Sequence, residues 1–99
     1  MKLTWSPAAR ERAADSDAWW REERPAAPHR FTEELIAAVR YILDYPEVPP
    51  VYVELDGYAV RRVLLKKTRQ HVYYSVQPEK GRIWIHLIWG TRREDPPPL

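Results

Sequence analysis

Three runs of alternating residues, separated by turn signals, fill the second half of the chain. The first run, Tyr58 to Lys67, follows Asp56-Gly57, a dipeptide typical of a tight hairpin turn. The next runs are His71 to Gln77 and Arg82 to Trp89, with a turn expected at Pro78 to Gly81. Because connections this short join antiparallel neighbours, the pattern predicts a mostly antiparallel sheet.

Alternation assigns the side chains of these strands to two faces. In the middle strand one face is expected to hold His71, Tyr73 and Ser75, and the other Val72, Tyr74 and Val76. In the last strand one face is expected to hold Ile83, Ile85, Leu87 and Trp89, and the other Trp84, His86 and Ile88. Arg61 and Arg62 are adjacent, so they point to opposite faces and only one can line an open face.

The first half predicts a short strand and two helices. Lys2 to Trp5 alternates polar and apolar residues, and Ser6-Pro7 is typical of a helix N-cap and first helical position. This first helix is expected to reach about Glu23. The second helix is expected to end before Pro46, and its apolar residues recur at helical spacing: Phe31, Leu35, Ala38, Val39 and Ile42. A further strand is expected at Val51 to Leu55.

These elements predict an α+β fold in which a two-helix hairpin packs on one face of a mostly antiparallel sheet. The 99 residues are expected to form one domain. Residues 94–99 are expected to be a proline-rich tail, since Pro96-Pro97-Pro98 cannot join a helix or an inner strand. The face of the sheet that the helices do not cover is expected to stay partly open.

Positive charge gathers in the sheet half. Glu79 is the one acid between Tyr58 and Arg93, whereas the same stretch holds nine basic residues: Arg61, Arg62, Lys66, Lys67, Arg69, Lys80, Arg82, Arg92 and Arg93. The whole chain carries a formal charge of only +2, because most acids lie in the helical half. A basic sheet joined to a mildly acidic helical half favours an anionic partner for the sheet.

Several kinds of chemistry are not expected. The chain has no cysteine, which removes disulfides, thiolate metal sites and thiol nucleophiles. Its three histidines, His29, His71 and His86, do not show metal-ligand spacing, so no metal or cofactor is expected. No apolar run approaches the ~20 residues of a membrane span, and nothing resembles a signal peptide, so a cytoplasmic location is expected.

The order of elements, together with particular residues, resembles the RelE/ParE family of type II toxin–antitoxin toxins. The matching pieces run through the whole chain: Trp5 to Ala9, Phe31 to Pro46, Val60 to Leu65, His71 to Val76, and Ile88 to Arg93. The resemblance implies a toxin neutralised by a cognate antitoxin. Within the family, RelE-like members cleave mRNA in the ribosomal A site, whereas ParE-like members poison DNA gyrase.

RNA cleavage by 2′-OH attack needs a base, an acid and charge stabilisation at the phosphate. The resemblance implies that strand lysines and arginines and a C-terminal tyrosine or histidine fill these roles. Here His71 stands where an arginine is expected, Arg92 or Arg93 matches the C-terminal arginine, and no tyrosine follows. The candidate catalytic residues of a ribonuclease variant are Lys67, His71 and Arg92.

These departures favour a ParE-like toxin that acts by contact with gyrase and needs no reaction of its own. Two alternatives remain open, a RelE-like mRNA interferase and an inactivated, non-toxic binding domain of the same fold. The residues expected to contact the target are Arg61, Lys66, Lys67, Arg69, His71, Trp89, Arg92 and Arg93. The residues expected to contact the antitoxin are Trp19, Trp20, Arg62 and Trp84. One of Trp19 and Trp20 is expected to be exposed, because a narrow helical stripe cannot bury both.

Overall fold

The computed structural model describes residues 1–99 and contains five strands, two α-helices and one 3₁₀ turn. In chain order these are β1 (Lys2–Trp5), α1 (Pro7–Glu23), α2 (Arg30–Asp44), β2 (Val51–Leu55), β3 (Tyr58–Leu65), β4 (Gln70–Gln77), η1 (Pro78–Lys80) and β5 (Arg82–Gly90). The sequence predicted each helix and strand, with ends that differ by at most two residues. The largest difference is at β3, which ends at Leu65 because Lys66 begins a turn.

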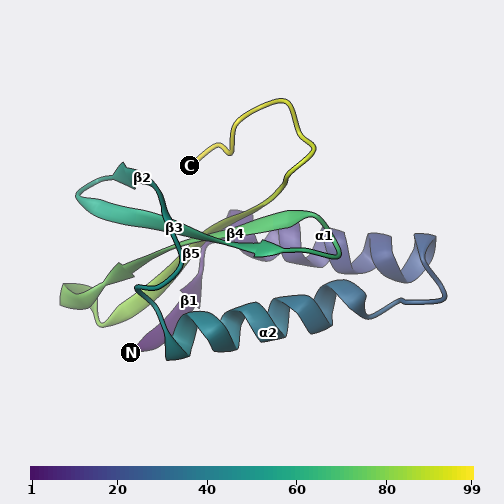
Figure 1. The fold of residues 1–99 in the computed structure, drawn as a ribbon, viewed down its shortest axis with the longest axis horizontal. Helices are drawn as coiled ribbons and strands as arrows, with labels where there is room; N and C mark the ends of the chain where they lie inside the picture. The colour runs from purple at the N-terminus through teal and green to yellow at the C-terminus, as the bar shows by residue number, and fades with distance from the viewer.

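The strands form one sheet in the order β1-β5-β4-β3-β2. β1 runs parallel to β5, with Lys2 opposite Arg82, and every other pair is antiparallel. Both helices lie on one face of this sheet, and the C-terminal tail arches over the other (Figure 1). The predicted fold is confirmed: a helix hairpin covers one face of a mostly antiparallel sheet. We call the face without helices the open face.

α1 begins where the sequence predicted, and its N-cap also ties it to the sheet. The Ser6 hydroxyl accepts a hydrogen bond from the Ala9 amide at 2.9 Å and donates one of 2.7 Å to the His86 carbonyl. Pro7 occupies the first turn, where its missing N–H leaves no bond unmade. Only Ala9 of this helix is fully buried, so much of α1 remains available for contacts outside the core.

α2 is the strongly amphipathic helix. Phe31, Ala38 and Ile42 are buried on the side that faces the sheet, which fits their spacing along one helical stripe. Thr32 donates a hydrogen bond of 2.9 Å to Asp17 and so joins α2 to α1. The helix ends at Asp44, one residue before Tyr45 and two before Pro46, which explains why it stops there.

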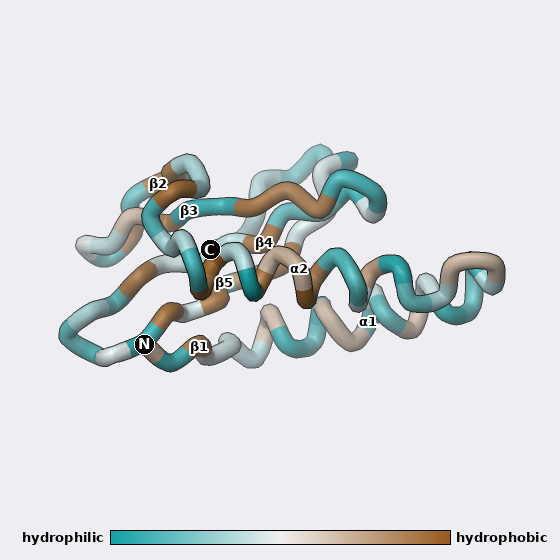
Figure 2. The backbone as a smooth tube through the Cα atoms, turned by 60° about the horizontal axis from the view of Figure 1, so that its bottom comes forward, coloured by the Kyte–Doolittle hydropathy of each residue, from teal (hydrophilic) through white to brown (hydrophobic).

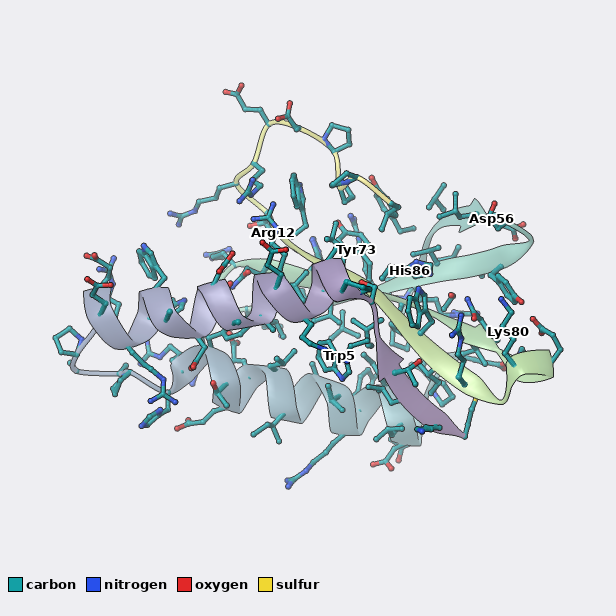
Figure 3. All side chains as sticks on the ribbon, turned by 180° about the vertical axis from the view of Figure 1, so that it is seen from behind. Trp5, Arg12, Asp56, Tyr73, Lys80 and His86 are labelled. Atoms are coloured by element: carbon teal, nitrogen blue, oxygen red, sulfur yellow. The ribbon has the colours of Figure 1, made fainter.

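The core lies mainly between the helices and the sheet. Tyr74, Ile83 and Ile85 from the sheet meet Phe31 and Ile42 from α2 in this layer. Figure 2 shows hydrophobic stretches along the strands above the two helices, and Figure 3 shows Trp5 between α1 and α2. The open face has a small apolar cluster of its own, formed by the buried residues Val60, Tyr73 and Leu87.

The predicted faces of β5 are wrong from Leu87 onward. The register passes from Tyr73 opposite Leu87 to Tyr74 opposite Ile85, so β5 holds one extra residue, His86, at a bulge. Since a one-residue insertion reverses the faces that follow it, Leu87 lies on the open face and Ile88 lies in the core beneath the helices.

The bulge also changes the placement of two tryptophans. Trp84 lies opposite Ser75, and Trp89 lies opposite His71. Directly opposed residues share a face of the sheet, so Trp84 and Trp89 both lie on the open face rather than on opposite faces. The open face is therefore richer in aromatic side chains than the alternation predicted.

The predicted hairpin turn at Asp56-Gly57 is confirmed. Both residues have positive φ, 54° and 83°, as a type I′ turn requires. Gly81 is also left-handed, with φ of 63°, and ends the 3₁₀ turn before β5. Neither helix has the length and apolar character that crossing a membrane would demand.

Candidate functional site

Six cationic side chains from three separate elements line a cleft of about 510 Å³ at one end of the sheet. α1 and its C-cap provide Arg12 and Arg24, the β3–β4 turn provides two more, and the segment after β5 provides the last two. We call this the basic cleft; its cations are Arg12, Arg24, Lys67, Arg69, Arg92 and Arg93. Its floor includes Trp20 from α1 and Ile88 from the helix-covered face of β5.

The cations of the basic cleft have no carboxylate partners. The one ion pair in the molecule joins Arg21 and Asp17, one turn apart on α1, at 2.9 Å. Asp15 also lines the cleft but pairs with none of its cations. Unpaired cations that share one concave surface focus a positive potential there, so the cleft is suited to an anionic ligand.

A carboxylate does hold the turn that carries Lys67 and Arg69, but through the backbone. Glu34 of α2 accepts hydrogen bonds from the Lys67 amide at 2.8 Å, the Thr68 amide at 2.9 Å and the Thr68 hydroxyl at 2.8 Å. Arg69 has a left-handed backbone with φ of 59°, a conformation unusual outside glycine. Its amide bonds to Leu65 and its carbonyl to Thr91, so this conformation is fixed on both sides.

Two guanidinium groups contact the ring of Trp89. Arg12 from α1 is 4.5 Å from the centre of the indole ring, and Arg93 is 4.3 Å from it. The indole N–H donates a hydrogen bond of 3.0 Å to the Asp95 carbonyl in the tail. In Figure 3, Arg12 lies on the side of α1 nearest the tail. These contacts restrain Arg12 and Arg93 before any ligand arrives, because cation–π contacts hold each guanidinium near the ring.

A second concave surface lies on the open face. It has a volume of about 250 Å³, and its lining includes side chains of β2, β3 and β4 beneath the C-terminal tail. We call it the open-face hollow; its sheet residues are Tyr52, Arg62, His71, Tyr73, Trp89 and Gly90. Arg62 is 4.8 Å from the Tyr52 ring centre, and the Tyr52 and Tyr73 rings are 5.2 Å apart. Pro96 and Pro97 of the tail cover one side.

Within the open-face hollow, the surroundings of His71 favour the neutral form of its imidazole. Burial lowers the pKa of His71 below its ordinary value of 6.5, and the nearby charge of Arg62 lowers it further. A neutral imidazole can accept a proton, and an adjacent guanidinium can stabilise a negative charge. The pair therefore has the chemical capacity for a base and an anion stabiliser.

The three candidate catalytic residues are not brought together. Lys67 and Arg92 line the basic cleft, whereas His71 lines the open-face hollow. Arg93 lines both and connects them. Lys66 is exposed at the β3–β4 turn and lines neither surface.

The structure separates Arg61 from the other residues expected to contact a target. Its guanidinium donates to the carbonyls of Glu47 and Pro49 at 2.9 and 2.7 Å, on the connection between α2 and β2. Arg62 is the member of the pair that faces the open side, in the open-face hollow. The sequence showed that only one of Arg61 and Arg62 can line the open face, and the structure identifies it as Arg62.

The tryptophans expected to contact an antitoxin have different exposures. Trp19 is 47% exposed, whereas Trp20 is half-buried against the core, which confirms that one of the two is exposed. Trp84 is half-buried on the open face, where the Arg82 guanidinium stacks 4.3 Å from its ring centre.

Beside Trp84, His86 and Ser75 form a structural contact. The His86 Nε2 atom lies 2.8 Å from the Ser75 hydroxyl. Burial, followed by the charge of Arg82, lowers the pKa of His86. Ser75 has no exposed surface, so its hydroxyl is inaccessible to a substrate. No three His, Asp or Glu side chains are arranged to hold a metal ion.

Sequence reasoning missed the contribution of α1 to the basic cleft. Arg12, Ser16, Trp20 and Arg24 all line it. They recur every four residues, which places them along one side of the helix. That spacing was a usable signal, because it places two cations and an aromatic ring along one side of the helix.

Solved structures show what this fold is similar to. The sequence matches no protein-family model and no curated protein sequence. A chain from the chromosomal ParDE TA system of P. aeruginosa superposes with a TM-score of 0.70 and 17% identity, over 93% of this chain and 97% of that one. The YoeB/ParE toxin from Agrobacterium tumefaciens superposes with a TM-score of 0.60 and 20% identity, over 91% and 98%. Strand order, helix placement and these full-length matches together show that the chain has the RelE/ParE toxin fold.

Proposed function

We propose that this chain is the toxin of a type II toxin–antitoxin system, that a cognate antitoxin neutralises it, and that it is ParE-like and arrests growth through DNA gyrase. The observation that carries the toxin assignment is the superposition on two toxin-system structures over nearly the full length of each chain. The matches cover 93% and 91% of this chain and 97% and 98% of the matched chains, so the likeness extends over nearly the whole of each fold.

Two features favour the ParE-like target over RNA cleavage. Residues 94–99 hold no tyrosine or histidine, and their ionisable side chains are two exposed carboxylates. In addition, Lys67 and Arg92 lie in a different concave surface from His71. A toxin that acts by protein contact does not require these three side chains to converge, whereas a cleavage site does.

A RelE-like mRNA interferase is the second candidate, and one observation favours it. The neutral His71 beside Arg62 in the open-face hollow provides two of the three roles that 2′-OH attack needs. On this alternative the hollow, rather than the basic cleft, would be the catalytic surface.

The antitoxin is proposed to cover apolar surface that the fold leaves exposed. Trp19 on α1 is the largest such side chain in the helical layer. We assign antitoxin contacts to Trp19, Trp20, Arg62 and Trp84. An amphipathic or extended segment that buried Trp19 would gain the hot-spot energy typical of interface tryptophans. Its affinity is expected to weaken with salt, because acidic residues of the segment would meet basic strands.

Three measurements test the proposal. The chain is expressed alone in bacterial cells, and the purified protein is added to a gyrase supercoiling reaction and to a translation reaction. Growth arrest with inhibited supercoiling and intact translation is the expected result. Blocked translation with cuts in the mRNA would establish the interferase instead. The cuts should then be lost in His71→Gln and kept in the surface control Arg40→Gln. Normal growth with both reactions unaffected would leave the non-toxic binding domain as the remaining reading.

A further inference from the structure

We propose that the open-face hollow recognises a proline-rich extended segment, and that the tail of this chain, residues 94–99, is the segment that occupies it. The tail follows β5 and arches over the open face (Figure 1). While docked, it covers Arg62 and His71, which line the hollow beneath it. The inference goes beyond the proposed function, since it concerns a contact within the chain and holds whether or not the chain is a toxin.

The tail is chemically suited to this mode of recognition. Pro96, Pro97 and Pro98 have no backbone N–H, so the segment cannot join the hydrogen-bond ladder of the sheet. Consecutive prolines favour the polyproline II conformation, which advances about 3.1 Å per residue and leaves its carbonyl groups unpaired within the segment. Such a segment is extended before it docks. It therefore loses little conformational entropy when it binds a groove lined by aromatic side chains.

The hollow offers the aromatic lining that such a segment needs. Its aromatic side chains from β2, β4 and β5 are Tyr52, Tyr73 and Trp89. The Tyr52 and Tyr73 rings meet edge to face, with centres 5.2 Å apart and planes at 67°. Pro96 and Pro97 lie against this surface. Pro97 is half-buried, whereas every other residue of the tail is exposed, so Pro97 is the residue that the hollow holds most closely.

A hydrogen bond fixes the start of the segment. The Trp89 indole N–H donates to the Asp95 carbonyl at 3.0 Å, and this carbonyl directly precedes the first proline. No other hydrogen bond joins residues 94–99 to the rest of the chain. A proline-rich segment provides acceptors but few donors, so the donor must come from the groove. Trp89 supplies that donor, and its ring also lines the hollow.

The end of the tail continues toward α1. Pro98 lines an adjoining concavity of about 330 Å³, together with residues that include Leu87 of β5 and Ala8 of α1. In Figure 3 the tail passes above the labelled Tyr73 and Arg12. Successive prolines therefore contact successive parts of one surface, as expected for an extended ligand.

The backbone directs the tail onto the hollow of its own chain. After β5 the Arg93 amide bonds to the Gly90 carbonyl at 3.4 Å, in a turn that leads the chain back over the sheet. Only five residues separate Trp89 from Asp95. A segment on so short a tether has an effective concentration of about millimolar. The tail of the same chain is therefore favoured over the tail of a second copy.

The contact is limited, and this makes the tail a releasable cover. One hydrogen bond and one half-buried proline hold six residues. A proline-rich segment of higher affinity would displace the tail and take its place in the hollow. Displacement would expose Arg62 and His71, which are residues proposed to contact the antitoxin and the target.

The test uses the full-length chain. Because the chain has no cysteine, Leu99→Cys allows a single nitroxide label at the end of the tail. Paramagnetic relaxation of the backbone amides then reports which surface the label meets. The amides of Ala8 and Leu87 are expected to lose most of their signal. Ala26 lies beyond the other end of α1, about 25 Å away along the helix, and its amide is expected to keep its signal.

Two variants of the labelled chain separate recognition of proline from attraction of charge. Pro96→Gly, Pro97→Gly, Pro98→Gly keeps the charge and frees the backbone, and it is expected to reduce the relaxation at the same amides at least about twofold. The matched control Glu94→Gln, Asp95→Asn keeps the prolines and every backbone carbonyl but removes the negative charge of the two side chains. It is expected to leave the relaxation unchanged.

A free peptide tests the recognition directly. The probe is the hexapeptide Glu-Asp-Pro-Pro-Pro-Leu, with Glu-Asp-Gly-Gly-Gly-Leu as its control. Each is titrated into the triple-glycine variant while the amide shift of Tyr73 is followed. A tail that stays docked must have a dissociation constant below its effective concentration, so the proline peptide is expected to bind at about millimolar concentration or below. Trp89→Phe in the same variant removes the indole donor and is expected to weaken this binding.

Four results would overturn the proposal. The first is equal relaxation at Ala8 and Ala26, and the second is an equal loss of relaxation in the triple-glycine variant and the charge control. The third is equal binding of the two peptides, or none by either at about 10 mM. The fourth is undiminished relaxation when the label and the observed amides are on different molecules, which would assign the tail to a second copy.

The nitrogen–proton spectrum of each variant checks its fold. The substituted tail residues are exposed or half-buried outside the core, so the variants are expected to fold. None of these measurements uses growth arrest, supercoiling or translation, so failure here is distinguishable from failure of the proposed function.

Discussion

The Tyr74 phenol donates a hydrogen bond of 2.7 Å to the Pro46 carbonyl. It thereby joins the middle of β4 to the segment that leaves α2, across the core. Tyr74 has no exposed surface, and burial raises the pKa of its phenol to about 12. This hydrogen bond therefore stabilises the fold, and its contribution to stability depends on pH.

Tyr74→Phe is expected to lower the free energy of unfolding by about 1 kcal/mol at neutral pH, since the Pro46 carbonyl loses its donor. The difference from wild type is expected to shrink as pH rises from 10.0 to about 12. In that window the unfolded phenol loses its proton while the folded one keeps it, so the wild type loses stability. Urea unfolding at neutral and alkaline pH measures both effects. A difference that stayed constant through the window would contradict the account.

Glu34→Gln is expected to destabilise the β3–β4 turn by about 1–2 kcal/mol, because the turn loses a charged acceptor that binds three donors. Hydrogen exchange at the Lys67 and Thr68 amides should become faster. Glu33→Gln is the matched control, since it removes the same charge from the start of α2 without touching the turn. Equal exchange in the two variants would refute the role of Glu34.

Acid is expected to destabilise the fold through His86. Burial lowers the pKa of this imidazole below 6.5, so near that pH the folded state binds fewer protons than the unfolded state. Its contribution to stability is complete above pH 6.5 and is lost as pH falls below that value. His86→Gln should therefore flatten the dependence of unfolding free energy on pH between neutral and mildly acidic conditions. An unchanged slope in the variant would count against this assignment.

Deleting residues 94–99 is expected to open the hollow without unfolding the sheet. The deletion removes the Asp95 carbonyl that accepts the Trp89 indole bond and the prolines that line the hollow. Modification of His71 by diethyl pyrocarbonate, followed by mass spectrometry, should become faster. His71→Gln in the truncated chain identifies the modified site. If the rate at His71 is the same in both chains, the tail does not shield the hollow.

Ile85→Ala is expected to lower the free energy of unfolding by about 2–5 kcal/mol, because it leaves a cavity in the layer between helices and sheet. Leu64→Ala makes a similar truncation at a side chain that is 41% exposed on β3, and should have a far smaller effect. Denaturant unfolding of both variants gives the comparison. Similar losses in the two would mean that the principal core is not beneath the helices.

The sequence predicted the fold well where local signals agree with one another. Ser6-Pro7 marked the start of α1, Pro46 marked the end of α2, and Asp56-Gly57 marked the first hairpin, and all three hold in the structure. Each signal depends on backbone geometry that a few adjacent residues determine. At these positions, long-range contacts did not change the structure that the local sequence favours.

The faces of β5 could not be predicted in the same way. Residues 83–89 are apolar or aromatic at nearly every position, so a bulge at His86 produces no break in the pattern. The tail is harder still, because the hydrogen bond from Trp89 to Asp95 depends on where two distant surfaces lie. The sequence therefore predicted the positive charge of the candidate site, but not its division into the basic cleft and the open-face hollow.

The parallel pairing of β1 with β5 places the first strand of the chain against the last. Until Arg82 to Gly90 leave the ribosome, Lys2 to Trp5 have no strand to join, and α1 has no β5 on which to rest. The pairing is a contact of very high sequence separation, which folds late. The mature surface, with its cleft and its hollow, is consequently complete only when synthesis of the sheet is complete, and a nascent chain stopped before β5 would lack Trp89, Arg92 and Arg93.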